Sequence, residues 1–209
     1  MRLVSWEDFE AGGIFDGVCG AVTAGVFDGV HKGHRKLIER VVKKAAKLGL
    51  SPAIFTFKEN PRNVLNGFKG AEHHPRASII PLEERLGVFS SMGIETCVLI
   101  EFSSGFSAMT GADFLKTVLR NANVRFMAVG EDFRCGRNAE FSSERVKEFV
   151  ENFHPVGPEK VLCEIVRPLL DGGRPVSSSR IREAVHKGDF ALASRLLGRR
   201  LPPDEKARL

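Results

Sequence analysis

The sequence predicts an α/β protein, a single domain with a parallel sheet and helices on both of its faces. Short apolar, β-prone runs alternate along the 209 residues with segments whose apolar side chains recur at helical spacing. Parallel strands at this spacing need right-handed crossovers, which place helices against both faces of the sheet. A chain of this length forms about one domain and buries about 70% of its unfolded surface.

The first predicted elements alternate strand and helix. Residues 19–27 are small and apolar and run into an Asp-Gly turn, as a buried strand does at its end. Residues 31–48 carry apolar side chains at helical spacing, and Gly49 follows as the expected stop. Residues 52–57 are again apolar and β-prone, and a polar loop is expected over 58–78.

The later elements continue this alternation. A helix over 81–92 has Pro at its start and Gly93 after its end, the residues favoured at those positions. The pattern then predicts a strand over 96–101, a helix over 111–121, a strand over 124–129, a helix over 142–152, a strand over 161–166 and short helices near 177–187 and 189–198. We place one domain over 1–188, followed by a C-terminal helix and polar tail over 189–209.

Composition limits the classes of partner. The chain has 31 basic and 26 acidic residues, a net charge of +5, and an isoelectric point near 9.2, which favours an anionic partner. No run approaches the roughly 20 apolar residues that span a bilayer, so no membrane partner is expected. The scattered thiols form no C-x-x-C and predict a cytoplasmic protein. They are Cys19, Cys97, Cys135 and Cys163.

The most informative segment is the decapeptide from Gly25 to His34, GVFDGVHKGH, between the first predicted strand and helix. In a parallel sheet, ligands bind beyond the carboxyl ends of the strands, where helix amides attract anions. His31 and His34 are three residues apart and share one face of the first turn, and Gly33 leaves no side chain over a ligand. The segment predicts a phosphate site, although a plain turn with incidental histidines is the simpler alternative.

Two competing phosphate motifs are excluded. The chain contains no G-x-x-x-x-G-K-[ST] sequence, and no G-x-G-x-x-G follows a predicted strand. The His73-His74 pair has no carboxylate or cysteine at metal-ligand spacing, so we interpret it as polar loop residues.

The decapeptide closely resembles the G-x-F-D-G-x-H-x-G-H box of bacterial FAD synthetases, members of the H-x-G-H nucleotidyltransferase superfamily. Three further stretches resemble motifs of that family in the same order. TFKENPRNVL (56–65) is similar to its flavin-loop motif, AVGEDFRCG (128–136) to its V-G-x-D-F-x-F-G motif and VSSSRIREAV (176–185) to its I-S-S-T-x-I-R motif. The resemblance extends over about residues 1–198.

This resemblance implies a Rossmann-like fold and FMN adenylyltransferase activity: AMP passes from ATP to FMN, giving FAD and pyrophosphate, with Mg2+. It implies catalytic roles for His31, His34 and Arg182. The implied ATP-binding residues are Gly25, Phe27, Asp28, Gly33, Gly130, Asp132, Ser177 and Ser178. The implied FMN-binding residues are Phe57, Asn60, Pro61 and Arg62. For Asp28, orienting the turn is an equally good role, and no metal ligands are predicted.

The chain departs from the family pattern at three points, which concern the flavin contacts more than the ATP site. Glu59 stands where the family usually has proline, Cys135 replaces an aromatic residue, and residues 137–140, RNAE, lack the usual R-x-G ending. Because only 21 residues follow Gly188, we also expect no riboflavin kinase module.

Two alternatives remain at this stage. One is a nucleotidyltransferase with another acceptor, such as nicotinamide mononucleotide, whose relatives usually carry proline where this chain has Gly29. The other is a nucleic-acid-binding module, which the basic charge suggests. The chain has no basic segment with interleaved aromatic residues, so no nucleic-acid partner is expected.

Overall fold

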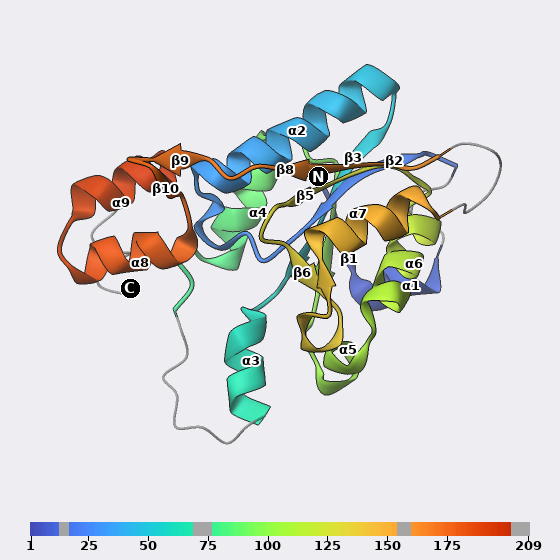
Figure 1. Ribbon diagram of the computed structural model, residues 1–209, viewed down its shortest axis with the longest axis horizontal. Coiled ribbons are helices and arrows are strands. Elements are labelled where there is room, and N and C mark those ends of the chain that lie inside the picture. The colour runs from blue at the N-terminus through green and yellow to red at the C-terminus, as the bar shows by residue number, and fades with distance from the viewer. Residues whose placement is uncertain (13–16, 69–76, 154–159, 202–209) are drawn as a thin grey trace.

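A computed structural model describes residues 1–12, 17–68, 77–153 and 160–201 of the chain. Its centre is a six-stranded sheet in the order β1-β4-β3-β2-β5-β8, and every neighbouring pair is parallel (Figure 1). The strands are β1 (Arg2–Ser5), β2 (Gly20–Ala24), β3 (Ser51–Phe57), β4 (Thr96–Ile100), β5 (Val124–Gly130) and β8 (Leu162–Val166). The predicted α/β class and parallel sheet are therefore confirmed.

Strand β2 lies at the point where the strand order reverses. Its neighbours are β3 on one side and β5 on the other, so Val22 is in register with both Ala53 and Met127. From β2 the chain first builds outward through β3 and β4, and later returns to add β5 and β8 on the opposite side. The crevice beyond the carboxyl end of β2 is where sheets of this kind bind ligands.

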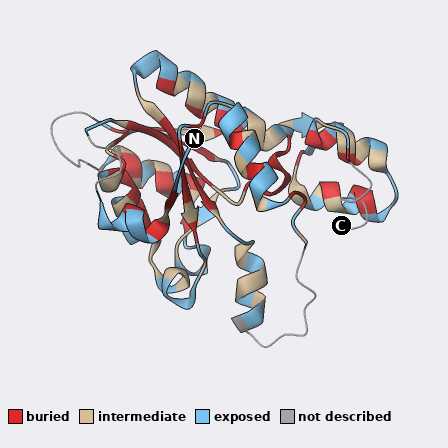
Figure 2. Ribbon diagram, turned by 180° about the vertical axis from the view of Figure 1, so that it is seen from behind, coloured by how far each residue is buried: buried red, intermediate tan, exposed pale blue. Residues whose placement is uncertain are grey.

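Helices cover both faces of the sheet, and adjacent residues of one strand face opposite cores. Ala21 packs in the core with α2 and α4, whereas Val22 packs in the core with α1, α6 and α7. Figure 2 shows the resulting band of buried strands. This two-sided burial explains why the strands read as continuous apolar runs. The helices are α1 (Trp6–Ala11), α2 (Lys32–Leu48), α4 (Leu82–Ser91), α6 (Gly111–Asn121) and α7 (Ser143–Glu151).

The C-terminal elements form a small layer beyond one end of the sheet, beside the start of α2 (Figure 1). Helix α9 packs on α8, and Ala193, Leu196 and Leu197 join the same core as α2. The layer consists of the antiparallel pair β9 (Leu170–Asp171) and β10 (Arg174–Pro175) with helices α8 (Ser178–His186) and α9 (Phe190–Leu197). The two predicted C-terminal helices are confirmed, while most of the predicted tail, 202–209, lies outside the described residues.

Short elements complete the described chain. The pair β6 and β7 is antiparallel, and the remaining helices are short. These elements are the 3-10 turns η1 (Asp28–Val30) and η2 (Arg137–Ala139), helices α3 (Pro61–Phe68) and α5 (Ser104–Ala108), and strands β6 (Arg134–Cys135) and β7 (Phe141–Ser142). Helix α2 ends where the sequence predicts, because Gly49 adopts the left-handed conformation at its C-cap.

Three expectations need correction. The first strand ends at Ala24, earlier than predicted, because the chain turns into η1. The predicted loop over 58–78 contains helix α3: proline is at its first position, and Asn60 Oδ1 accepts the Arg62 N–H. Strand β1 was missed because Val4 is its one buried residue, so no apolar pattern marks it.

Two further observations concern targeting and redox state. None of the described helices is long and apolar enough to cross a membrane. All four cysteines carry free thiols. The His73-His74 pair lies outside the described residues.

Candidate active site

The turn after β2 has an unusual backbone. Phe27, Gly29 and Val30 all adopt positive φ angles, of 52°, 81° and 38°. For a β-branched residue such as Val30 this is a rare conformation, kept only where the surroundings enforce it. Phe27 and Val30 are fully packed in the core, and a Cβ at Gly29 would come within 3.0 Å of Ile79. Strain of this kind is concentrated at functional sites, which supports the predicted role of the turn.

The two histidines of the turn lie against each other. Their rings stack with centroids 3.6 Å apart and planes inclined by 14°. His31 caps helix α2, since its Nδ1 accepts the backbone N–H of His34 at 3.2 Å. With Nδ1 acting as the acceptor, the proton of a neutral His31 ring is on Nε2, which becomes a donor.

Gly33 is closely packed by the protein. A Cβ there would lie 3.2 Å from the His31 ring and 3.4 Å from the carbonyl oxygen of Val176. Gly33 allows the first turn of α2 to approach both the His31 ring and the chain that enters α8.

Both histidines are neutral near pH 7. Burial lowers the pKa of His31 to about 4. Burial also holds the pKa of His34 well below its usual value, with smaller contributions from the charges of His31 and Arg85. The Nδ1 atom of His34 is buried and has no hydrogen-bond partner. The pair therefore offers a bound anion neutral hydrogen-bonding groups rather than cations.

Asp28 and Arg182 join the turn to helix α8. Asp28 is 6% exposed; its Oδ1 accepts the Ile79 N–H at 2.8 Å, and its Oδ2 is paired with Arg182 Nη2. The same Nη2 donates to the Ala77 carbonyl at 2.8 Å, and Ser178 Oγ donates to the Asp28 carbonyl at 2.8 Å. Arg182 Nε is buried without a partner. Asp28 thus orients both the turn and the arginine.

Four other residues of the predicted ATP set lie near the carboxyl ends of the strands or at the start of α8. Ser177 caps α8 by accepting the Arg180 N–H at 3.2 Å. Gly130 ends β5, the neighbour of β2, and a Cβ there would come within 3.0 Å of Asp132 Oδ1. The fourth, Gly25, follows β2 directly and donates its N–H to the Phe55 carbonyl at 3.0 Å.

The predicted flavin residues divide into an apolar and a polar group. Phe57 ends β3, and its ring meets those of Phe102 and Phe106 edge-on, with centroids 5.8 and 5.9 Å away. All three side chains are half-buried. Asn60 caps α3, and Arg62 on that helix is exposed. Phe102 and Phe106 were missed because neither lies in a recognised motif.

Arg85 on α4 was also missed. It is 6% exposed. Its Nη1 donates to the Val26 carbonyl at 2.8 Å, and its Nη2 donates to the carbonyls of Phe57 and, at 3.4 Å, Lys58. In the sequence it follows two glutamates near the start of a predicted helix, a pattern typical of a solvated arginine, so no signal could have found it.

These features define an open-sheet α/β protein with a strained, histidine-bearing turn at the switch point of its sheet. Its family follows from comparison with known sequences: the model of the FAD synthetase family matches residues 13–180. The chain belongs to the FAD synthetase family.

Curated relatives with a two-part name match the chain over most of its length. It is 30% identical over 174 residues to the bifunctional riboflavin kinase/FMN adenylyltransferase of Bacillus subtilis, covering 83% of this chain and 52% of that protein. The chain is also 30% identical to the Escherichia coli K12 protein of that name, and the match covers 85% of this chain and 53% of that protein. The chain thus spans about half the length of these relatives. A Geobacillus thermodenitrificans protein named as an enzyme of the same kind is 31% identical, and the match covers 85% of this chain and 88% of that protein.

One solved structure supports the fold. The crystal structure of a Streptococcus pneumoniae protein described as a macrolide-efflux protein is 28% identical, with a TM-score of 0.79. The match covers 96% of this chain and 72% of that one.

Proposed function

We propose that this protein is an FMN adenylyltransferase, which transfers AMP from ATP to FMN and releases pyrophosphate. Family membership and the names of the relatives support this reaction. The observation that carries the proposal is the assembly of His31, His34, Asp28 and Arg182 around one turn at the switch point. In this reaction an FMN phosphate oxygen bonds to the α-phosphorus, and the bond from that phosphorus to the β-bridging oxygen breaks.

The nucleotide side supplies positioning and charge stabilisation. The FMN phosphate is already a nucleophile, so no covalent intermediate or strong base is needed. The neutral rings of His31 and His34 would donate hydrogen bonds to the triphosphate without needing a counter-charge. Arg182, oriented by Asp28, has an unsatisfied Nε–H and would stabilise the leaving pyrophosphate.

Mg2+ is proposed to enter with ATP. The described residues contain no group of three or more histidine, cysteine, aspartate or glutamate side chains that could hold a metal ion. Mg2+ commonly keeps several waters and binds through substrate phosphates with one or two carboxylates. Most of its ligands would therefore come from the triphosphate and water.

The acceptor side is proposed to hold the flavin ring on the aromatic cluster of Phe57, Phe102 and Phe106. Aromatic edges and faces at half-buried positions suit a large planar heterocycle. Arg62, exposed on α3, would contact the FMN phosphate. The cluster lies at the carboxyl ends of β3 and β4, and the turn with the two histidines lies at the carboxyl end of β2 in the same sheet.

The test is a reaction of the purified chain with FMN, ATP and Mg2+, separated by chromatography. We expect FAD and pyrophosphate, and a loss of about a hundredfold or more in turnover for His34→Ala, the typical effect of removing one donor aimed at a transition state. Nicotinamide mononucleotide in place of FMN is the control acceptor. No FAD with any metal, together with adenylylation of the control acceptor, would contradict the proposal.

Three narrower proposals accompany this one. Residues 1–209 as such are expected not to phosphorylate riboflavin, and FMN formed from riboflavin and MgATP at catalytic rates would contradict this. The basic charge is assigned to the anionic substrates rather than to nucleic acid, so no salt-sensitive shift of RNA is expected in a gel. The free thiols support a cytoplasmic location.

A further inference from the structure

The segment between β3 and α4, residues 58–81, carries three of the four predicted flavin residues, Asn60, Pro61 and Arg62. We call it the acceptor segment, and Arg85 holds its N-terminal end. The Nη2 atom of Arg85 donates to the carbonyls of Phe57 and Lys58, where this segment leaves the sheet. Its Nη1 donates to the carbonyl of Val26. Val26 belongs to the turn after β2 that carries Asp28, His31 and His34, which we call the nucleotide turn. One guanidinium therefore bridges the exits of two neighbouring strands, β2 and β3.

The other end of the same segment is held by residues of the nucleotide turn. Ile79 N–H donates to Asp28 Oδ1, and the Ala77 carbonyl accepts from Arg182. Both described ends of the acceptor segment are thus attached to charged side chains that also hold the nucleotide side. Of these three side chains, Arg85 alone contacts both strand exits.

The chemistry of Arg85 is unusual for a structural residue. Its side chain is buried, and its guanidinium donates hydrogen bonds to backbone carbonyls, not to a carboxylate. Burial lowers the pKa of this guanidinium, which shows that the buried charge is costly, and Asp28 contributes a smaller opposing effect. The planar fork of arginine can serve two carbonyls in fixed directions, whereas the ammonium of lysine is a point charge on a flexible stem.

We propose that Arg85 is a positioning residue for both substrates. It fixes the acceptor segment to the nucleotide turn, so that loss of Arg85 weakens the binding of both ATP and FMN. The inference rests on the proposed function for the identity of the two ligands. Arg85 reaches the predicted FMN residue Phe57 only through that residue's backbone carbonyl. Its effect passes through the backbone at Val26 and Phe57, where a displacement of about 1 Å can cost up to about a hundredfold in rate.

The experiment compares Arg85→Lys and Arg85→Met with the wild type. Arg40→Met is the matched control, since Arg40 also makes paired hydrogen bonds, to Glu164 on β8, away from the turn. Each variant is measured for thermal unfolding, for KM of ATP and FMN in FAD formation, and for binding of a non-hydrolysable ATP analogue and of FMN by quenching of flavin fluorescence.

We expect Arg85→Lys to fold and to raise both KM values and both dissociation constants by about fivefold to tenfold, with a larger effect in Arg85→Met. Arg40→Met should leave all four values within twofold of wild type. The role is overturned if Arg85→Lys lowers the melting temperature but leaves both affinities unchanged, or if one substrate alone is affected. Absence of FAD formation in the wild type would instead contradict the proposed function, which these binding measurements separate from the role of Arg85.

Discussion

Arg180 and Arg182 lie two residues apart on helix α8 and have different surroundings. Arg182 points to the nucleotide turn and pairs with the buried Asp28. Arg180 points to the β9–β10 pair, where it donates to the carbonyls of Asp171 and Arg174 and pairs with the Asp171 carboxylate. Residues two positions apart on a helix project about 200° from each other, so one faces the sheet and the other the hairpin.

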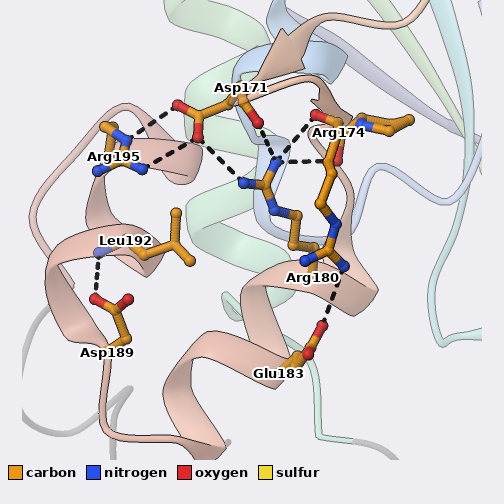
Figure 3. A network of polar contacts seen from close by, with 8 residues as sticks. Asp171, Arg174, Arg180, Glu183, Asp189, Leu192 and Arg195 are labelled. Atoms are coloured by element: carbon orange, nitrogen blue, oxygen red, sulfur yellow. Dashed lines mark hydrogen bonds and ion pairs between the residues drawn. The ribbon is translucent and has the colours of Figure 1, made fainter.

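The two ion-pair sites differ in what surrounds the carboxylate. Asp171 is shared between Arg180 and the largely exposed Arg195, and Arg174 pairs separately with Glu183 (Figure 3). The Asp171 network, as we name these five residues, holds the C-terminal layer together. The Asp28–Arg182 pair instead attaches that layer to the strained turn. The comparison teaches that contact with the turn after β2, not residue type, distinguishes Arg182 from an arginine that supports the fold.

Removing Arg182 gives the largest expected effect. Arg182→Ala should lower turnover by about a hundredfold or more and raise KM for ATP, because the proposed donor to the leaving phosphates is lost. It also leaves Asp28 buried and unpaired, which costs about 3–5 kcal/mol of stability. The double variant Arg182→Ala/Asp28→Asn should recover stability in urea unfolding without recovering activity. Recovery of both would show that Arg182 acts only in folding.

The second prediction concerns pH and separates the turn from the Asp171 network. His31 has a pKa lowered from 6.5 to about 4, so the unfolded chain binds a proton that the folded chain does not between these values. Stability therefore falls as pH decreases from 6.5 towards 4, by up to about 1.4 kcal/mol per pH unit. The Asp171 carboxyl has a lowered pKa because of Arg195 and Arg180, and its contribution is lost only as pH falls below the ordinary aspartate range.

His31→Asn is the matched variant for this measurement. Asparagine keeps a side-chain oxygen that can accept the His34 N–H at the helix cap but removes the titrating ring. Urea unfolding at pH 6.5, 5.5 and 4.5 should show a shallower loss of stability in the variant than in the wild type. Equal slopes would contradict a buried neutral His31.

The third prediction tests Arg180 as a supporting residue. Arg180→Met removes three hydrogen bonds to backbone carbonyls and one ion pair of a side chain that is 10% exposed. We expect a loss of about 1–3 kcal/mol in the free energy of unfolding, with KM for ATP within about threefold of wild type. A collapse of activity in a folded variant would show that the Asp171 network also positions the nucleotide.

The smallest effect is expected for Arg195. Its side chain is 57% exposed, and its bonds to Asp171 are open to solvent. Arg195→Ala should cost less than about 1 kcal/mol, and the difference should shrink in 1 M salt. A larger, salt-independent loss in urea unfolding would contradict the distinction between the surface network and the buried pair.

Local patterns predicted much of the fold and one half of the candidate site. Buried parallel strands are apolar on both faces, and glycine ends helices at positions such as Gly49, so these elements were recognisable. The histidine turn was recognisable because its residues are consecutive. Strand β1 and helix α3 were missed, since β1 has a single buried residue and α3 depends on a cap within a polar stretch.

The sequence by itself determined the α/β class, the order of the elements and the position of the turn that carries His31 and His34, because each depends on neighbouring residues. Only the tertiary structure decided that Arg182 meets Asp28, that Gly33 makes room for His31 and that Arg85 bridges two strand exits. These contacts join residues up to 154 positions apart. The local sequence around a helical arginine is the same whether its guanidinium is solvated or donates hydrogen bonds to buried carbonyls. The packing of the helix against the sheet decides between these two environments.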